Sequence, residues 1–353
     1  MIDLSLPVEA LTASLVDVPS VSGSETRLAD EVETALKQLP HLIVERDGDA
    51  VCARTDLGRA SRVVIAGHLD TVPVAENLPS RRDGERLYGC GTSDMKAGLA
   101  VMLRVAATLA TPRHDVTWLF YDNEEVEAAR NGLGRVARNT PRWLKADLAV
   151  LMEPTANRIE AGCQGTLRTL VVVPGKRAHS ARSWLGDNAI HRAGVVLTKL
   201  AAYEPRRVVL DGCEYREGLN AVRIEGGVSG NVVPDRCTVT VNYRFAPDRD
   251  EEEALAHVQE VLAPYECVPT DSSAGAPPRL GEEAAQDFIA AVGGDPVAKL
   301  GWTDVARFAA LGIPALNFGP GDPNLAHTRE EYVELSRIGE CERILRDYLA
   351  GVA

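Results

Sequence analysis

Histidine and acidic side chains follow apolar, strand-like runs at four separate points of this sequence. The four runs are Val63–Ala66, Val116–Tyr121, Leu148–Met152 and Ala315–Phe318. The side chains that follow them are, in the same order, His68 and Asp70, Glu124 and Glu125, Glu153, and His327. Ligands of open α/β sheets bind outside the carboxyl ends of the strands, so we expect these residues to converge on one site.

A metal centre is the chemistry that this set of side chains favours. Imidazole nitrogens and carboxylate oxygens together suit Zn²⁺ or a similar divalent ion. The seven cysteines are widely spaced and include no Cys-x-x-Cys pair, so neither a thiolate site nor a disulfide framework is expected. Any metal ion should therefore be held by His, Asp and Glu.

Each of these residues also has an ordinary structural explanation when it is taken alone. His68 could be a histidine in a turn, and Glu153 could merely end a strand. Asp94, which precedes a predicted helix, could be its N-cap, and the pair Glu124–Glu125 could be a solvated acidic turn. We favour a shared site because coincidence at so many strand ends is the weaker explanation.

Length and charge exclude several other classes of function. The chain has 353 residues, 45% of them hydrophobic and 25% charged, which is enough for two domains with substantial cores. The net charge is −13 and the basic residues are scattered, so nucleic-acid binding is not expected. The sequence has neither a signal-peptide pattern nor a run of about 18 apolar residues, so we expect a cytoplasmic protein.

The elements that position the acidic and histidine residues alternate between strands and helices. Ser22-Gly23-Ser24-Glu25 has the pattern of a capping box and predicts a helix that runs to about Leu39. A glycine-rich loop, Tyr88–Gly91, leads into a second predicted helix, Ala97–Leu109. This alternation predicts an α/β domain with a largely parallel sheet.

The pattern changes between residues 168 and 280. Strands are predicted at Leu170–Val173, Ala221–Glu225, Thr238–Arg244 and Glu266–Val268, and helices at Asp187–Leu200 and Asp250–Leu262. The order β-α-β-β-α-β is that of the ferredoxin-like split motif, and Thr270–Pro278 has the composition of a linker. We therefore expect a catalytic domain of residues 1–167 and 281–353 that carries an inserted α+β domain, residues 168–280.

Five segments, in order along the chain, resemble the co-catalytic zinc family of aminoacylases, glutamate carboxypeptidases, deacetylases and desuccinylases. The segments are His68-Leu69-Asp70, Gly89–Lys96, Glu124-Glu125, Glu153-Pro154-Thr155 and Ala326-His327. The resemblance covers essentially the whole chain. It implies a zinc aminopeptidase-like catalytic domain and an inserted ferredoxin-like domain that serves as a lid and for dimerisation.

The resemblance also implies two Zn²⁺ per chain, for which Co²⁺ or Mn²⁺ could substitute. His68 and Glu153 would ligate one ion, Glu125 and His327 the other, and Asp94 would bridge them. Two ions about 3.5–4 Å apart can clamp both the attacking and the developing oxygen of a hydrolysis.

Three further residues receive catalytic roles from the same resemblance. Glu124 would be the general base, which takes a proton from the attacking water and passes it to the leaving nitrogen. Asp70 would orient the ring of His68 through its other nitrogen. His179 would reach into the active site of the second subunit of a homodimer and stabilise the oxyanion; its structural alternative is a loop histidine beside two cations.

The segment Gly301–Phe308 resembles a stretch found in desuccinylases. It implies hydrolysis of N-succinyl-LL-diaminopimelate to succinate and LL-diaminopimelate, a step of lysine and cell-wall precursor biosynthesis. The residues that would bind this substrate are Arg244, Asn231, Arg307 and Thr303. An arginine fork suits a carboxylate, but Arg307 could instead pair with Asp304 on one helix face, Arg244 could face solvent from its strand, and Asn231 could be a turn residue.

The acyl group stays open at this point. Cys163-Gln164-Gly165-Thr166 stands where desuccinylases often carry Arg-Arg-Gly. An acetylornithine deacetylase, or another aminoacylase or carboxypeptidase of the family, is therefore the alternative. A non-catalytic metal-binding sensor is disfavoured, because a pure binding site has no need of a base such as Glu124 beside its ligands.

Overall fold

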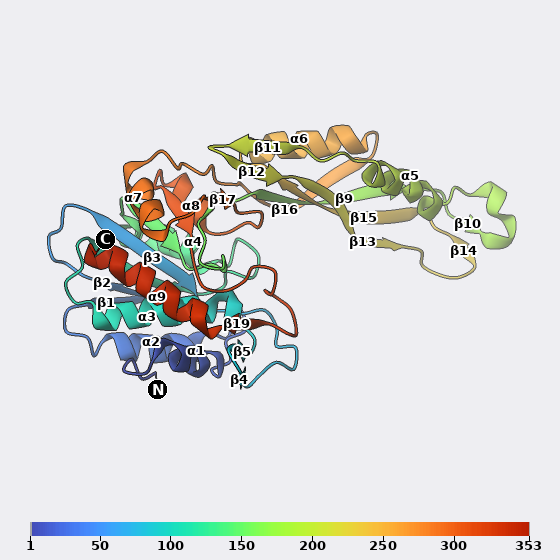
Figure 1. Cartoon of the computed structure of the whole chain (residues 1–353). Coiled ribbons are helices and arrows are strands. Elements are labelled where there is room, and N and C mark those ends of the chain that lie inside the picture. The colour runs from blue at the N-terminus through green and yellow to red at the C-terminus, as the bar shows by residue number, and fades with distance from the viewer. Residues whose placement is uncertain (1, 353) are drawn as a thin grey trace. The chain divides into compact units, whose positions relative to one another are not determined.

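The computed structural model describes residues 2–352, which form two compact units (Figure 1). The first unit comprises residues 2–162, 278–298 and 304–352, and the second comprises residues 163–277 and 299–303. These bounds differ from the expected ones by a few residues at each junction. The first strand of the second unit begins at Gly165, so residues 163–167 belong to it. The chain also re-enters the second unit at residues 299–303, which was not expected. Two hydrogen bonds hold this segment there: the Gln164 backbone amide donates to the Lys299 carbonyl, and the Trp302 indole donates to the Ala274 carbonyl.

The first unit is built on an eight-stranded sheet with the order β1-β2-β6-β3-β7-β18-β8-β17. Its central strands β6, β3, β7 and β18 run parallel to one another. They are continuous apolar segments, as expected of strands covered on both faces, and every residue of β6 is buried. The strands are β1 (Ile43–Asp47), β2 (Ala50–Arg54), β3 (Arg62–His68), β6 (Asp115–Tyr121), β7 (Leu148–Leu151), β8 (Glu160–Ala161), β17 (Val297–Ala298) and β18 (Ala315–Asn317). The predicted α/β fold with a mostly parallel sheet is confirmed.

Helices pack on this sheet, and a small three-stranded sheet lies beside them. The helices are α1 (Val8–Val16), α2 (Thr26–Leu36), α3 (Ala97–Thr108), α4 (Gly132–Asn139), α7 (Glu283–Val292), α8 (Val305–Ala310) and α9 (Leu335–Ala350). The small sheet consists of β4 (Arg81–Asp83), β5 (Arg86–Tyr88) and β19 (Tyr332–Glu334). α1, α3 and α9 pack together. α3 lies close to the end of β7 because Gly98 has no side chain; a Cβ there would lie 2.5 Å from the Met152 carbonyl oxygen.

The helix predicted after Ser22 exists, but the predicted capping box is wrong. The N-cap residue of α2 is Glu25, and it makes no side-chain cap hydrogen bond. The Ser22 hydroxyl donates instead to Asp70, at 2.7 Å. The Glu25 carboxylate accepts the amide of Asn123, at 3.1 Å. Both side chains are therefore engaged by the loops at the strand ends rather than by their own helix.

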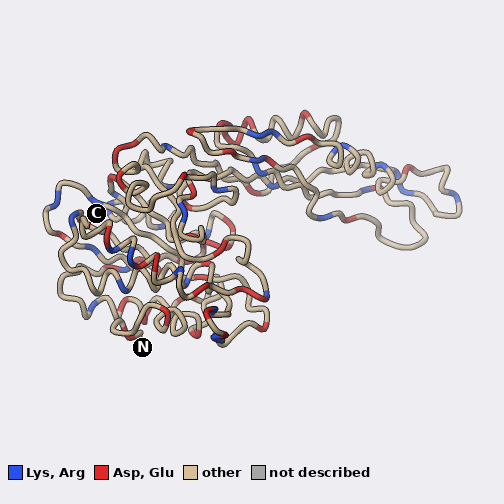
Figure 2. The backbone as a smooth tube through the Cα atoms, in the orientation of Figure 1, with Lys and Arg blue, Asp and Glu red and all other residues tan. Residues whose placement is uncertain are grey.

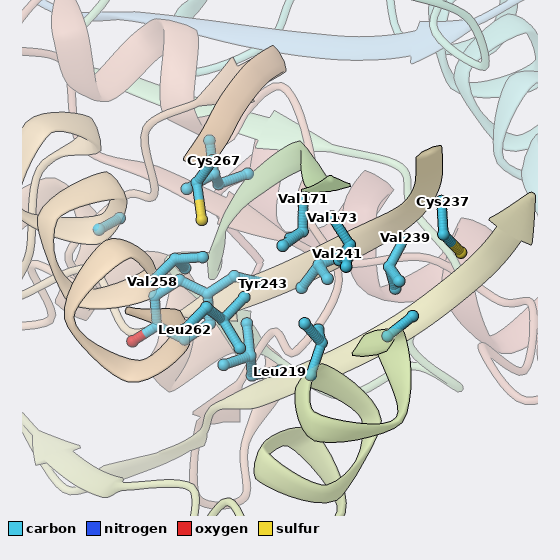
Figure 3. Packing of buried hydrophobic residues seen from close by; sticks show 14 of the residues in the cluster. Val171, Val173, Leu219, Cys237, Val239, Val241, Tyr243, Val258, Leu262 and Cys267 are labelled. Carbon is cyan, nitrogen blue, oxygen red and sulfur yellow. The ribbon is translucent and has the colours of Figure 1, made fainter. Parts of the chain in front are cut away.

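The second unit contains a four-stranded antiparallel sheet with the order β13-β15-β9-β16. Its elements are β9 (Gly165–Pro174), α5 (Ala189–Ala201), β13 (Gly218–Gly226), β15 (Arg236–Phe245), α6 (Glu251–Leu262) and β16 (Glu266–Ser273). This is the predicted β-α-β-β-α-β order. The side chains between the sheet and the two helices form one apolar core, in which Val171, Val239, Val241 and Val258 are fully buried (Figure 3).

Three features of the second unit depart from the expectation. β16 continues to Ser273, so the segment expected as a linker from Thr270 begins with paired strand. A hairpin, β11 (Arg207–Leu210) and β12 (Cys213–Arg216), was not predicted. The same is true of the short pair β10 (Ala178–His179) and β14 (Val232–Val233) and of the 3-10 helix Ser180–Leu185.

Charged residues and cysteines are distributed as the composition indicates. Figure 2 shows Lys and Arg interspersed with Asp and Glu along the backbone of both units. All seven cysteines are buried and free of disulfides. Among the described residues, no helix is long and apolar enough to cross a membrane.

Candidate active site

The residues that follow the strands of the first unit lie together. His68 is the last residue of β3, and Glu124 and Glu125 follow β6. Glu153 comes two residues after the end of β7, and His327 lies in the loop after β18. β3 pairs in parallel with both β6 and β7, so the carboxyl ends of these strands lie at one edge of the sheet.

Three overlapping groups of side chains at this edge have the geometry of a metal site. Within each group the potential ligand atoms lie within 4.8 Å of one another. The groups are His68, Asp94 and Glu153; His68, Glu124 and Glu125; and Asp94, Glu125 and His327. The first and third groups together contain all five predicted ligands and share Asp94. The structure thus brings together every residue for which the sequence predicted metal binding.

The ring of His68 is buried and held in one orientation. Its Nδ1 lies 3.0 Å from the carbonyl oxygen of Asp70, and because a carbonyl can only accept, Nδ1 carries the proton. Nε2 therefore faces the carboxylate of Asp94, at 3.2 Å. The Asp70 carboxylate lies farther from the ring, 3.4 Å from Nδ1. Asp70 orients the ring mainly through its backbone carbonyl.

His327 faces the same carboxylate from the opposite loop. Its Nε2 lies 2.8 Å from Glu125 and 3.4 Å from the second oxygen of Asp94. Hydrogen bonds with Asp94 and Glu125 raise the pKa of the His327 ring to about 11. Asp94 therefore stands between two imidazole rings, one on each of its oxygens, which is the position of a bridging ligand.

The Asp70 carboxylate, fully buried, holds the loop that carries the two glutamates. One of its oxygens accepts the amide of Glu124 and the other accepts the amide of Glu125, each at 3.0 Å. Burial raises the pKa of Glu124 well above its ordinary value; Glu125 and Glu153 raise it further, and His68 opposes them. A carboxyl with a raised pKa is suited to exchanging a proton near neutral pH.

The donor set fits a pair of divalent ions of the zinc type. Two imidazoles and three carboxylates are available, which are ligands that Zn²⁺ accepts. Both rings face carboxylates through Nε2, the atom with which each could ligate a metal ion. The three-dimensional arrangement therefore fits the group that the donor chemistry suggested.

Two of the predicted residues lie side by side in the second unit, His179 at the end of β10 and Asn231 just before β14. His179 pairs with Val232, and its Nδ1 accepts the amide of Ala181 at 3.0 Å. The backbone carbonyl of Asn231 accepts the amide of Ser180, at 2.9 Å. Both side chains are exposed.

Arg244 and Thr303 also belong to the second unit. Arg244 lies on β15 opposite Thr166 and is half-buried. Burial, helped by the nearby Arg168, lowers its pKa. Among the described residues, its guanidinium has no hydrogen-bonded or ion-paired carboxylate. The Thr303 side chain is buried, and its carbonyl lies 3.6 Å from the Cys163 sulfur.

Arg307 lies on α8 of the first unit and makes the ion pair that the sequence left open as an alternative. Its Nε donates to Asp304, at 2.5 Å. Asp304 is fully buried and also accepts the side-chain amide of Asn131, at 2.9 Å. Arg307 is thus tied to its own unit.

One residue close to the site was not predicted. Glu331 is buried, and its carboxylate accepts backbone amides from the loop that carries Asp94. It follows His327 by four residues in His327-Thr328-Arg329-Glu330-Glu331. No sequence pattern distinguishes it from the exposed Glu330 beside it, so only the three-dimensional structure reveals it.

Comparison with known proteins gives one family and many similar relatives, two of which are described here. The sequence model of peptidase family M20/M25/M40 matches residues 64–351. A Mycobacterium tuberculosis protein provisionally named succinyl-diaminopimelate desuccinylase DapE is 59% identical, over 99% of this chain and 100% of its own length. The succinyl-diaminopimelate desuccinylase of Corynebacterium glutamicum is 52% identical, over 96% of this chain and 95% of its own.

Solved structures share the fold at lower sequence identity. A tripeptidase from Staphylococcus aureus has a TM-score of 0.80 and 20% identity, and covers 100% of this chain and 99% of its own. Bacillus subtilis YXEP, described as a dinuclear metal binding peptidase, has a TM-score of 0.70 and 16% identity over 98% of this chain and 97% of its own. At these identities the likeness concerns the fold alone.

Proposed function

Because the chain belongs to peptidase family M20/M25/M40, we propose that it hydrolyses the amide bond of N-succinyl-LL-diaminopimelate and releases succinate and LL-diaminopimelate. The observation that carries this proposal is the cluster around Asp94, in which two histidines and two glutamates converge beside a further glutamate that can act as a base. The named activity of the Corynebacterium relative supplies the substrate.

The metal ligands in this proposal are the five residues of the cluster. His68 and Glu153 would hold one Zn²⁺, Glu125 and His327 would hold the other, and Asp94 would contribute to both. When bound, the two ions polarise the amide carbonyl and make the attacking water more acidic. Co²⁺ or Mn²⁺ are the expected substitutes, since they accept the same nitrogen and oxygen ligands.

Glu124 is the general base and acid. Its carboxyl takes a proton from the attacking water and then gives it to the nitrogen that leaves as the amino group of diaminopimelate. The position of this carboxyl beside Glu125, with both within reach of the His68 ring, supports the role. The backbone amide of Glu124 donates a hydrogen bond to the Asp70 carboxylate, and this bond fixes the loop from which the Glu124 side chain projects.

Arg244 binds a carboxylate of the substrate. A half-buried guanidinium that lacks a hydrogen-bonded carboxylate among the described residues is costly unless an anion completes it. N-succinyl-LL-diaminopimelate offers the succinyl carboxylate and the two carboxylates of diaminopimelate. Asn231 and Thr303 are proposed as further contacts. Arg307 is the least supported of the four proposed substrate-binding residues, because its Nε already donates a hydrogen bond to Asp304.

In this proposal two copies of the chain form a homodimer through their second units. His179 of each subunit then acts in the active site of the other subunit. β13 is an edge strand, and among the described residues no strand pairs with its outer edge. It exposes Ile224 (47% exposed), and Ile190 of the adjoining α5 packs close to Gly226 of the same strand while remaining exposed itself. An open edge bordered by apolar side chains is a surface that pairing with a second copy would cover.

A hydrolysis panel tests the proposed substrate. Zinc-loaded protein is assayed with N-succinyl-LL-diaminopimelate, N-acetylornithine and a set of N-acyl amino acids and dipeptides. We expect the highest kcat/KM for the succinyl substrate. Preference for N-acetylornithine or for a dipeptide would establish the alternative, a deacetylase or carboxypeptidase of the same family.

A further inference from the structure

The carboxylate of Glu331 is bonded to three backbone amides of one loop. One oxygen accepts the amides of Ser93 and Asp94, at 2.8 and 3.0 Å, and the other accepts the amide of Gly91, at 2.9 Å. The side chain is 2% exposed, so water does not compete for these bonds. Three amide donors on one buried carboxylate form a rigid clamp.

The clamped loop carries the carboxylate at the centre of the metal cluster. Asp94 faces His68 on one side and His327 on the other. Its backbone amide is one of the three that Glu331 accepts, so the clamp acts on the same residue whose side chain lies between the two rings. The direction of the Asp94 side chain depends on the backbone that Glu331 holds.

Further bonds tie the two chain segments together. The Ser93 hydroxyl donates to the carbonyl of Tyr332, at 2.7 Å, and accepts the amide of Asp322, at 3.2 Å. The Gly89 amide donates to the carbonyl of Glu331, at 3.1 Å. The segment that contains His327 is thereby fastened at both ends to the loop that contains Asp94, and Glu331 supplies the only carboxylate among these bonds.

We propose that Glu331 is a positioning residue, which holds Asp94 in its bridging orientation before any metal ion binds. The inference rests on the proposed function, because it concerns the ligand that this function places between the two ions. Groups behind a metal ligand raise affinity by removing the cost of ordering the ligand at the moment of binding. Glu331 does this through the backbone, without touching the metal ion.

Hydrogen exchange of the unmodified, metal-free protein is the first test. The amides of Gly91, Ser93 and Asp94 should exchange slowly without metal, and addition of Zn²⁺ should change their protection little. If these amides exchange freely in the metal-free protein and become protected only with Zn²⁺, the metal ion orders the loop and the proposal is overturned. This test needs no variant and so does not depend on whether one folds.

The second test compares Glu331→Gln with Glu330→Gln. Glu330 is the exposed neighbour, so its substitution removes the same charge one residue away. In Glu331→Gln the new amide group faces a backbone N–H that has lost its acceptor. Zn²⁺ dissociation constants, from competition with a chelator, should rise about 10- to 100-fold for Glu331→Gln and stay unchanged for Glu330→Gln.

The outcomes separate the two proposals. Equal zinc affinity in the parent and in Glu331→Gln overturns the positioning role, even where the variant is less stable, because a purely structural glutamate would lower stability alone. An equal loss of affinity in Glu330→Gln also overturns it, since the effect would then come from charge. A parent chain that binds no divalent ion overturns the proposed function itself.

Discussion

Glu124 and Glu125 are neighbours in the chain, and the same carboxylate holds their backbone amides, yet their side chains have different surroundings. Glu125 lies 2.8 Å from the ring of His327. Glu124 is influenced by His68 and Glu153 and has a raised pKa. Asp70 accepts one amide with each oxygen, which fixes the backbone of both residues in the loop after β6. We proposed different tasks for the two side chains.

Substituting each glutamate by glutamine should separate these tasks. Glu124→Gln should keep its metal ions and its fold but lose at least about 10²-fold in kcat, because glutamine cannot accept the proton of the attacking water. Glu125→Gln should instead lose bound metal. Elemental analysis of both variants, measured beside kcat, checks the assignment; near-normal turnover of Glu124→Gln would show that the base lies elsewhere.

Arg244 should act on substrate binding more than on the chemical step. Arg244→Lys keeps the charge but not the fork that bonds both oxygens of a carboxylate. We expect KM for the succinyl substrate to rise about tenfold or more while kcat changes less. Arg216→Lys, at an exposed arginine of β12, is the matched control and should leave KM unchanged. Equal effects in both variants would remove Arg244 from the site.

The sequence predicted the residues of the cluster, and Asp70 as the residue that orients His68, but not the glutamate that holds the loop of Asp94. His68, Glu125 and His327 could be predicted because imidazoles and carboxylates recur after several apolar runs, and a shared site explains that recurrence better than coincidence does. Glu331 could not, because its role depends on contact with a loop 237 residues earlier, where it accepts the Asp94 amide. The orientation of the His68 ring by a backbone carbonyl is likewise invisible in side-chain types.

At the scale of elements, a buried glutamate fastens the hairpin of the second unit to its sheet. Glu217 lies between β12 and β13 and pairs with Arg206, at 2.7 Å. It also accepts the Tyr243 hydroxyl from β15 and the amide of Ala246. Burial is the largest single influence on the pKa of Glu217 and raises it. The hydrogen bonds together outweigh burial, so the pKa of Glu217 is lowered.

Glu217→Gln should destabilise the second unit at neutral pH. The loss should be about 1–2 kcal/mol, since a hydrogen bond to a charged group contributes about 1.5–3 kcal/mol and Arg206 is partly solvated. Because the folded pKa is lowered, the stabilisation is present above the ordinary glutamate value and is lost as pH falls below it. Denaturant unfolding of variant and parent should therefore converge in acid.

Glu214→Gln provides the control for this measurement. Glu214 is an exposed glutamate of β12 that pairs with Arg216. Its substitution should not change the unfolding midpoint, because exposed ion pairs contribute little. If both variants lose the same stability, or if the Glu217→Gln difference persists in acid, the buried network does not account for the effect.

The elements that the sequence predicted are those with a continuous or alternating apolar pattern. β6 has the continuous pattern and β15 the alternating one. Both strands have ten residues or fewer, and both lie where expected. The three-residue strands β5 and β19 were missed, because their pairing joins Tyr88 to Tyr332 and no local pattern reports such a distant partner. The capping box at Ser22 failed for the same reason, since Asp70 accepts its hydroxyl.

At the scale of the whole molecule, the proposed dimer can be tested through its surface. Ile224→Lys places a charge on the exposed face of the edge strand β13 and should convert a dimer to monomers in sedimentation velocity. Val209→Lys changes an apolar side chain on the β11–β12 hairpin that is even more exposed, and it should leave the dimer intact. A parent chain that sediments as a monomer would contradict the proposal directly.

Complementation tests whether His179 acts in the partner's site. His179→Ala and Glu124→Ala should each be inactive, with losses of about 10²–10³-fold in turnover for the histidine. After subunit exchange, a heterodimer has one site with both residues intact and should recover part of the activity. Confirmed exchange without any recovery would place the action of His179 within its own chain.

The order in which the two units are interleaved along the chain bears on how the protein is made. The sheet of the second unit ends at Ser273, whereas the first unit still lacks α7, α8, α9 and the strands β17, β18 and β19 at that point. On the ribosome, the second unit has nearly all of its residues before the first has its central sheet. His327 follows the whole sheet of the second unit along the chain, so the nascent chain acquires this member of the cluster only after that sheet has been made.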